Sequence, residues 1–200
     1  MSVFDELVGQ RRAADVLKQA AAGVGMTHAW LFTGPPGSGR SNAARALATA
    51  LLCPEQGCGH CDLCHQVAIG SHPDLEVVRP QGLSYSVRQT RELVLRAAGA
   101  PTVGRWRVVL FEDADRSTEA AANALLKAIE EPPPRTVWLL CAPSPDDMVI
   151  TIRSRGRVVT LRTPPADAIA HVLITRDSVA PELAAFLVRV DGVPESLASY

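Results

Sequence analysis

The feature that most constrains the fold of this chain is a glycine-rich loop at residues 34–41. Its members are Gly34, Pro35, Pro36, Gly37, Ser38, Gly39, Arg40 and Ser41. An apolar run at residues 29–33 leads into the loop, and an alanine- and leucine-rich segment at residues 41–52 follows it. Strand, glycine loop and helix in this order form a phosphate-binding loop, in which backbone N–H groups and a helix N-terminus surround an anion. The segment therefore predicts a P-loop nucleotide-binding domain.

One position of this loop departs from the usual pattern G-x-x-x-x-G-K-[ST]. Gly34, Gly39 and Ser41 fit the pattern, whereas Arg40 stands where lysine is expected. Lysine brings a compact charge to the phosphates, and arginine brings a wide planar fork. We expect the loop to bind ATP or ADP, with Mg²⁺ held by the Ser41 hydroxyl, and to support little hydrolysis. The alternative is a glycine-rich turn that holds no ligand.

The rest of the chain alternates between strand and helix patterns. Apolar runs predict strands at residues 74–78, 107–111, 136–142 and 158–161, and helical patterns fall at residues 8–24, 87–98 and 117–130. Such alternation predicts an α/β fold, a parallel sheet with helices on both faces, over residues 1–162. After the boundary at residues 163–165, helical patterns at residues 166–175, 181–190 and from 194 predict a small all-helical domain over residues 163–200.

Four cysteines predict a metal site inserted between the second helix and the second strand. Their spacing is x4, x2 and x2, at Cys53, Cys58, Cys61 and Cys64. Four thiolates so close together suit a closed structural Zn²⁺ site. An iron–sulfur cluster is the main alternative, and two disulfides would need an oxidising compartment. His60 or His65 could substitute for one of the cysteines, but each is expected as an exposed neighbour of the site, and Cys141 is expected in the core.

An acidic pair follows the strand predicted at residues 107–111. In P-loop ATPases an Asp-Glu pair at this place holds Mg²⁺ and polarises the attacking water. Here the pair reads Glu112-Asp113, so the two carboxylate lengths are exchanged. A shift of about 1 Å in a catalytic group can lower a rate by about a hundredfold. We expect an Mg²⁺ site of poor catalytic competence.

Charge and hydropathy exclude two classes of protein. The formal net charge of −1 excludes a globally basic nucleic-acid-binding protein. No apolar run reaches the length of a membrane span, and the N-terminus lacks the basic and apolar regions of a signal peptide. We therefore expect a cytoplasmic protein without membrane partners.

The order of these motifs resembles the clamp-loader branch of the AAA+ ATPases. The residues that carry the resemblance are Val8-Gly9-Gln10, residues 28–33, the cysteine insertion, residues 123–133 and Ser154-Arg155. The stretch Asn-Ala-Leu-Leu-Lys, continued by Glu-Glu-Pro-Pro at residues 130–133, is the most specific of them. The resemblance covers nearly the whole chain and implies a place in a pentameric loader, with gamma/tau-type and delta-type subunits, the sliding clamp and primed DNA as partners.

Within this family the resemblance implies a particular division of labour. Arg155 matches the arginine finger that enters a neighbouring subunit's ATP site. The family also has three groups that act on the subunit's own nucleotide. In this chain their places are taken by Arg40, by the apolar Ala142-Pro143 and by Glu195. This combination suits a delta-prime-type stator, and the family's C-terminal collar domain is expected to be absent from these residues. The alternatives are an active gamma/tau-type ATPase and a zinc-containing binding module without hydrolysis.

Overall fold

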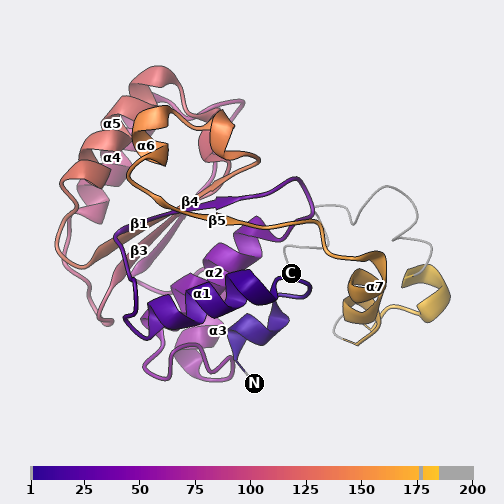
Figure 1. Ribbon diagram of the computed structural model, residues 1–200. Coiled ribbons are helices and arrows are strands. Elements are labelled where there is room, and N and C mark those ends of the chain that lie inside the picture. The colour runs from indigo at the N-terminus through magenta and orange to yellow at the C-terminus, as the bar shows by residue number, and fades with distance from the viewer. Residues whose placement is uncertain (1, 176–177, 185–200) are drawn as a thin grey trace.

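The computed structural model describes residues 2–175 and 178–184 of the chain (Figure 1). The strands are β1 (Ala29–Thr33), β2 (Leu75–Val78), β3 (Arg107–Phe111), β4 (Thr136–Ala142) and β5 (Arg157–Thr160). The α-helices are α1 (Arg11–Ala21), α2 (Arg40–Leu52), α3 (Asp62–Ala68), α4 (Val87–Ala97), α5 (Glu119–Glu130), α6 (Ile150–Arg153) and α7 (Ala166–Thr175). Short 3₁₀ turns lie at η1 (Val3–Glu6), η2 (Ala114–Arg116) and η3 (Pro145–Asp147).

The five strands form one parallel sheet in the order β2-β3-β4-β1-β5. Every residue of the central strands β1 and β4 is buried. Strands buried on both faces are built from continuous apolar runs, which is why the sequence patterns locate them so well. The predicted α/β architecture is confirmed.

Two layers of helices cover the sheet. Trp30 and Phe32 of β1 point into a core shared with α1 and α2, and Ala29 and Leu31 point into a second core shared with α4 and α5. Alternate residues of a strand face opposite sides, so one apolar strand supplies both cores. Figure 1 shows α1, α2 and α3 on one face of the sheet and α4, α5 and α6 on the other.

Some predicted boundaries differ from the structure. The helix expected at residues 8–24 is shorter, because Gly9 has a φ of +73° and α1 begins only at Arg11. Helices α3 and α6 were not predicted, since seven and four residues are too few to show a helical period.

The C-terminal part of the chain follows Pro164-Pro165. Helix α7 occupies the predicted residues 166–175, and residues 181–184 are helical. The rest of the helix expected at 181–190, the piece from 194 and Glu195 lie outside the described residues. A separate helical domain over residues 163–200 stays a prediction. None of the helices described is long and apolar enough to cross a membrane.

Asp74 anchors the loop before β3, a role that the sequence did not reveal. Asp74 is 1% exposed, and its carboxylate accepts hydrogen bonds from the backbone N–H groups of Thr102, Val103 and Gly104. Burial acts to raise the pKa of Asp74, but these donors and the nearby His72 hold that pKa below its usual range. The ionised form is therefore stabilised in the folded chain.

Replacing Asp74 by asparagine should lower the free energy of unfolding by about 2–3 kcal/mol, because the amide NH₂ would face backbone donors. The wild-type contribution is fully present above the usual aspartate pKa of about 3.9 and is lost as pH falls through the lower folded value. Urea unfolding at pH 7 and pH 3 measures both effects. Asp15→Asn, on the exposed face of α1, is the control. Equal stability of the two variants at pH 7 would contradict the assigned role.

Candidate functional site

The predicted phosphate-binding loop joins β1 to α2 and borders a cavity of about 390 Å³. Gly37 and Gly39 have φ values of +78° and +79°, and a Cβ on either would meet no atom within 4 Å. Helix α2 starts after Gly39 without a side-chain cap, so the N–H groups of its first turn have no capping side chain. Residues 34–41 thus form the open cradle that a P-loop requires.

The base of the loop is held by close packing. A Cβ on Gly34 would lie 2.4 Å from Ser38 Oγ and 2.7 Å from the Leu161 carbonyl oxygen, so only glycine fits there. The Gly34 N–H donates to the Pro143 carbonyl at 3.1 Å. Ala142 and Pro143 offer no polar side chain at this point, in line with the predicted loss of a group that senses phosphate.

Gln10 ties the loop to the N-terminal segment and to the end of β5. Its side-chain N–H₂ donates to the carbonyl oxygens of Ser38, at 3.1 Å, and Arg162, at 2.5 Å. The Val8-Gly9-Gln10 motif therefore contacts the P-loop.

Arg40 lies across the mouth of the loop. One guanidinium nitrogen donates to the Gly34 carbonyl at 3.0 Å, and another lies 3.3 Å from Asp113 Oδ1. The side chain is 11% exposed, and its Nε has no hydrogen-bond partner within the described residues. Arg40 thus connects the phosphate cradle to the acidic pair.

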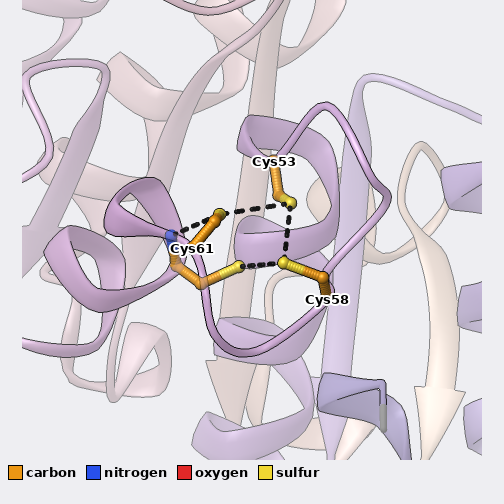
Figure 2. Close-up of side chains that lie close together, drawn as sticks. Cys53, Cys58 and Cys61 are labelled. Atoms are coloured by element: carbon orange, nitrogen blue, oxygen red, sulfur yellow. Dashed lines mark hydrogen bonds between the residues drawn. The ribbon is translucent and has the colours of Figure 1, made fainter.

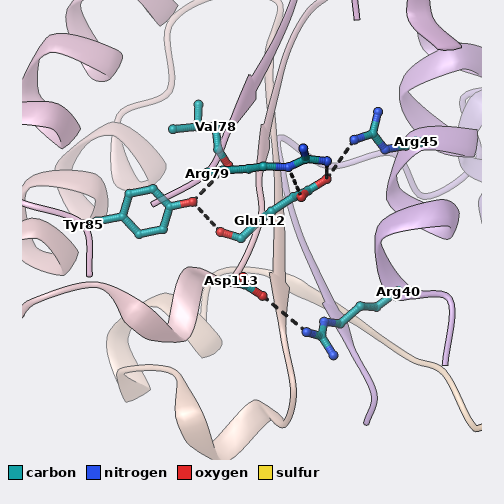
Figure 3. Close-up of polar contacts among 7 residues, drawn as sticks. All are labelled: Arg40, Arg45, Val78, Arg79, Tyr85, Glu112 and Asp113. Carbon is teal, nitrogen blue, oxygen red and sulfur yellow. Dashed lines mark hydrogen bonds and ion pairs between the residues drawn. The ribbon is translucent and has the colours of Figure 1, made fainter. Parts of the chain in front are cut away.

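The acidic pair is bound by arginines (Figure 3). Glu112 Oε1 accepts from Arg45 of α2 at 2.9 Å, and Glu112 Oε2 accepts from Arg79 Nε at 2.7 Å. Asp113 has a φ of +48° and faces Arg40. Both carboxylates expected to serve Mg²⁺ and water therefore already hold guanidinium groups, and their catalytic role stays a prediction.

Sequence reasoning missed Arg45 and Arg79 as parts of this site. Arg79 follows the last residue of β2, and Glu112 follows the last residue of the neighbouring β3. Because the carboxyl ends of parallel strands share one edge, this adjacency was a usable signal. Arg45, on the second turn of α2, carried no such signal.

The four predicted metal-ligand cysteines come together (Figure 2). The Sγ atom of Cys53 lies 3.8 Å from that of Cys58 and 3.7 Å from that of Cys61, and the Cys58–Cys64 distance is 3.9 Å. A tetrahedral Zn²⁺ with Zn–S bonds of about 2.3 Å requires sulfur atoms about 3.8 Å apart. No disulfide joins them, so the donor set and its spacing fit Zn²⁺.

The pKa values of the cluster shift in both directions, and burial together with the Cys61 and Cys53 thiols raises the pKa of Cys64. Burial acts to raise the pKa of Cys53, but nearby N–H groups, with those of Cys58 and Gly57 foremost, lower it to about 7. The Cys61 sulfur caps the N-terminus of α3, because it accepts a hydrogen bond from the Cys64 N–H at 3.4 Å. His60 is exposed and contacts the Cys58 carbonyl oxygen, and it forms a second, three-residue group of possible metal ligands with Glu55 and Cys58.

Arg155 lies far from the chain's own P-loop. It precedes β5, whose residues Arg157 and Thr160 pair with Trp30 and Thr33 of β1. Because the strands are parallel, Arg155, which precedes β5, lies toward the amino ends of the strands, whereas the loop follows the carboxyl end of β1. The side chain is 40% exposed, pairs with Glu130 at 2.7 Å and donates to the Thr151 carbonyl at 2.9 Å.

The parallel sheet and the glycine loop after its central strand define a P-loop domain of the AAA+ class. Residues 9–165 match the family described as "DNA polymerase III, delta subunit", and the chain belongs to this family. It is 38% identical to the DNA polymerase III subunit gamma/tau of Mycobacterium tuberculosis over 157 residues, which are 76% of this chain and 27% of the relative. It is 34% identical to the DNA polymerase III subunit delta' of Bacillus subtilis over 165 residues, which are 81% of this chain and 50% of the relative.

A solved structure agrees with this fold. The gamma subunit-related protein of Thermotoga maritima superposes with a TM-score of 0.61 at 21% identity, over 90% of this chain and 58% of that protein. The chain thus spans half or less of the two curated relatives just described. These relatives support a clamp-loader subunit of DNA polymerase III, in keeping with the family resemblance of the sequence motifs.

Proposed function

We propose that this chain is the AAA+ part of a delta-prime-type clamp-loader subunit, a stator that supplies Arg155 to the ATP site of a neighbouring subunit. The observation that supports the proposal is the position of Arg155, which is exposed at the amino ends of the strands, whereas its own P-loop follows the carboxyl end of β1. A nucleotide bound by the P-loop of the same chain therefore lies at the other end of the sheet. We infer that the target of the Arg155 guanidinium is the γ-phosphate of a nucleotide bound by a neighbouring subunit.

The chain's own site is arranged against hydrolysis. Arg40 replaces the P-loop lysine, and guanidinium groups hold Glu112 and Asp113. A carboxylate that bonds two guanidiniums is a poor base for water, since its lone pairs are already engaged. We infer binding of a nucleotide phosphate group with little or no turnover, and structural Zn²⁺ in the cysteine module.

A gamma/tau-type ATPase is the second candidate, because the chain is also 38% identical to a gamma/tau subunit. The two candidates differ in the activity of the isolated chain. A stator leaves hydrolysis to its partners, whereas a gamma/tau-type subunit hydrolyses ATP at its own P-loop.

The isolated chain should turn over ATP far more slowly than about 1 per second, the lower end of ordinary enzymes. Arg40→Lys alone should not raise the rate to that level, because Arg45 and Arg79 still hold Glu112. A coupled ADP-release assay measures both proteins, with a buffer blank as control. Turnover at 1 per second or faster would favour the gamma/tau-type function.

Reconstitution tests the stator role directly. The full-length protein that contains this chain is combined with gamma/tau-type and delta-type subunits, the sliding clamp and primed DNA. We expect ATP-driven clamp loading only when it is present. Equal clamp loading in its absence would remove the proposed function.

A further inference from the structure

The P-loop cavity carries an excess of positive charge. It is lined by the guanidinium-bearing residues Arg40, Arg45, Arg79 and Arg116, and by the carboxylates of Glu112 and Asp113. Four cations and two anions leave a formal charge of +2, beside the uncapped N-terminus of α2. Such a site attracts an anion that carries more than one negative charge.

The same cavity is poorly suited to Mg²⁺. This ion needs oxygen ligands in near-octahedral geometry and is held in P-loop sites by the acidic residue after the strand. Both carboxylate oxygens of Glu112 are bonded to Arg45 and Arg79, at 2.9 and 2.7 Å, and the carboxylate is 12% exposed. The guanidinium groups of Arg45 and Arg79 supply positive charge that a metal ion would otherwise supply.

Buried polar atoms without partners lie beside the cradle. Ser38 lines the cavity, is 1% exposed, and its hydroxyl has no hydrogen-bond partner within the described residues. Arg40 Nε is also buried and has no hydrogen-bond partner within the described residues. A buried polar group without a partner is unfavourable, so these atoms indicate a ligand that accepts hydrogen bonds.

We propose that this cavity binds a diphosphate group without Mg²⁺, with Arg45 and Arg79 supplying the positive charge that the metal supplies in P-loop ATPases. The inference rests on the proposed function, since it concerns the same P-loop site, and it departs from the expectation of Mg²⁺ at Ser41. The diphosphate would come from a nucleotide or from inorganic pyrophosphate, which share the chemistry recognised here.

Calorimetric titration of the whole chain tests metal independence. ADP and sodium pyrophosphate are titrated separately, in buffer freed of divalent ions on a resin and in the same buffer with Mg²⁺. No chelator is added, because it would also remove zinc from the cysteines. We expect binding in the metal-free buffer that is at least as tight as with Mg²⁺, because Mg²⁺ in solution complexes the diphosphate and competes with the protein for it. Tighter binding of ADP would identify a nucleotide, and equal binding would identify pyrophosphate as sufficient.

Two variants separate the arginine site from a metal site. Glu112→Gln frees Arg45 and Arg79 from their carboxylate and should tighten metal-free pyrophosphate binding by about tenfold. A site that needs Glu112 for Mg²⁺ would respond in the opposite direction. Arg79→Gln should weaken metal-free binding by about tenfold, and this 59% exposed side chain can be replaced without loss of the fold.

Arg88→Gln is the matched control, because Arg88 is 87% exposed on α4 and does not line the cavity. Circular dichroism and zinc content check that each variant is folded. Binding that requires Mg²⁺, or that is equal in wild type and Arg79→Gln, would overturn the proposal. Absence of binding in both buffers would also overturn it, while leaving the stator role of Arg155 to be decided by reconstitution.

Discussion

Replacing Arg155 by alanine should lower ATP hydrolysis at the neighbouring site it serves by about 10³-fold, because a guanidinium in trans neutralises charge that develops on the transferred phosphoryl group. The measurement is DNA-stimulated ATPase and clamp loading by the complex of the full-length protein with its partners. The family resemblance implies that the other interfaces of such a loader have their own finger residues, so we expect total turnover to fall less than at the single site. Clamp loading should fall with it.

The ion pair with Glu130 does not prevent this role. Its two side chains are 40% and 39% exposed, and a pair so accessible to water contributes about 1 kcal/mol or less. The attraction of a triphosphate can therefore replace it when the subunits meet. Glu130 lies at the end of the helix within the family-specific stretch at residues 123–133, and it orients Arg155 in the free chain.

Arg153→Ala is the matched control for Arg155→Ala. Arg153 ends α6, is 35% exposed and pairs with Asp146, so its loss removes a similar surface arginine two residues away. The Arg153 variant should load clamps as the wild type does, and both variants should keep their fold and zinc content. Wild-type activity of the Arg155→Ala complex would refute trans activation and favour a zinc-containing binding module.

The fold was largely predictable because parallel strands are marked by their own composition. Residues 29–33 and 136–142 are apolar except for the buried Thr33 and Thr136, and the structure has β1 and β4 with the same bounds. Helix α3 was not predictable in this way, because it begins where Cys61 caps it and ends seven residues later. Short helices depend on tertiary contacts and show no period of their own.

The candidate site was predictable only where its residues are neighbours in sequence. The glycine loop and the four cysteines are local patterns, and the structure brings each together. The contacts of Glu112 with Arg45 and Arg79 join residues 67 and 33 positions apart. A pattern search along the chain does not reveal such pairs. The sequence therefore showed the exchanged order of Glu112 and Asp113, but not the arginines that pair with Glu112.

Replacing Cys64 by alanine should remove zinc from the chain, from one equivalent to nearly none. Four thiolates at sulfur–sulfur distances of 3.7–3.9 Å form a closed site, and three ligands leave it open to water. Structural zinc contributes an apparent free energy of about 10 kcal/mol or more in small zinc modules. Residues 53–68 should therefore lose protection from hydrogen exchange. Metal analysis and hydrogen exchange measure the two effects.

Cys141→Ala is the control, because Cys141 is the fifth cysteine and lies buried in β4, outside the cluster. This variant should keep its zinc and lose about 1 kcal/mol of stability through a small cavity. In Cys64→Ala the amides of β1 and β4 should stay protected, since the sheet has two cores of its own. An absorption band at about 400 nm in the wild type would show that the cysteines hold an iron–sulfur cluster and not zinc. Full zinc content in Cys64→Ala would show that His60 or another group supplies the fourth ligand.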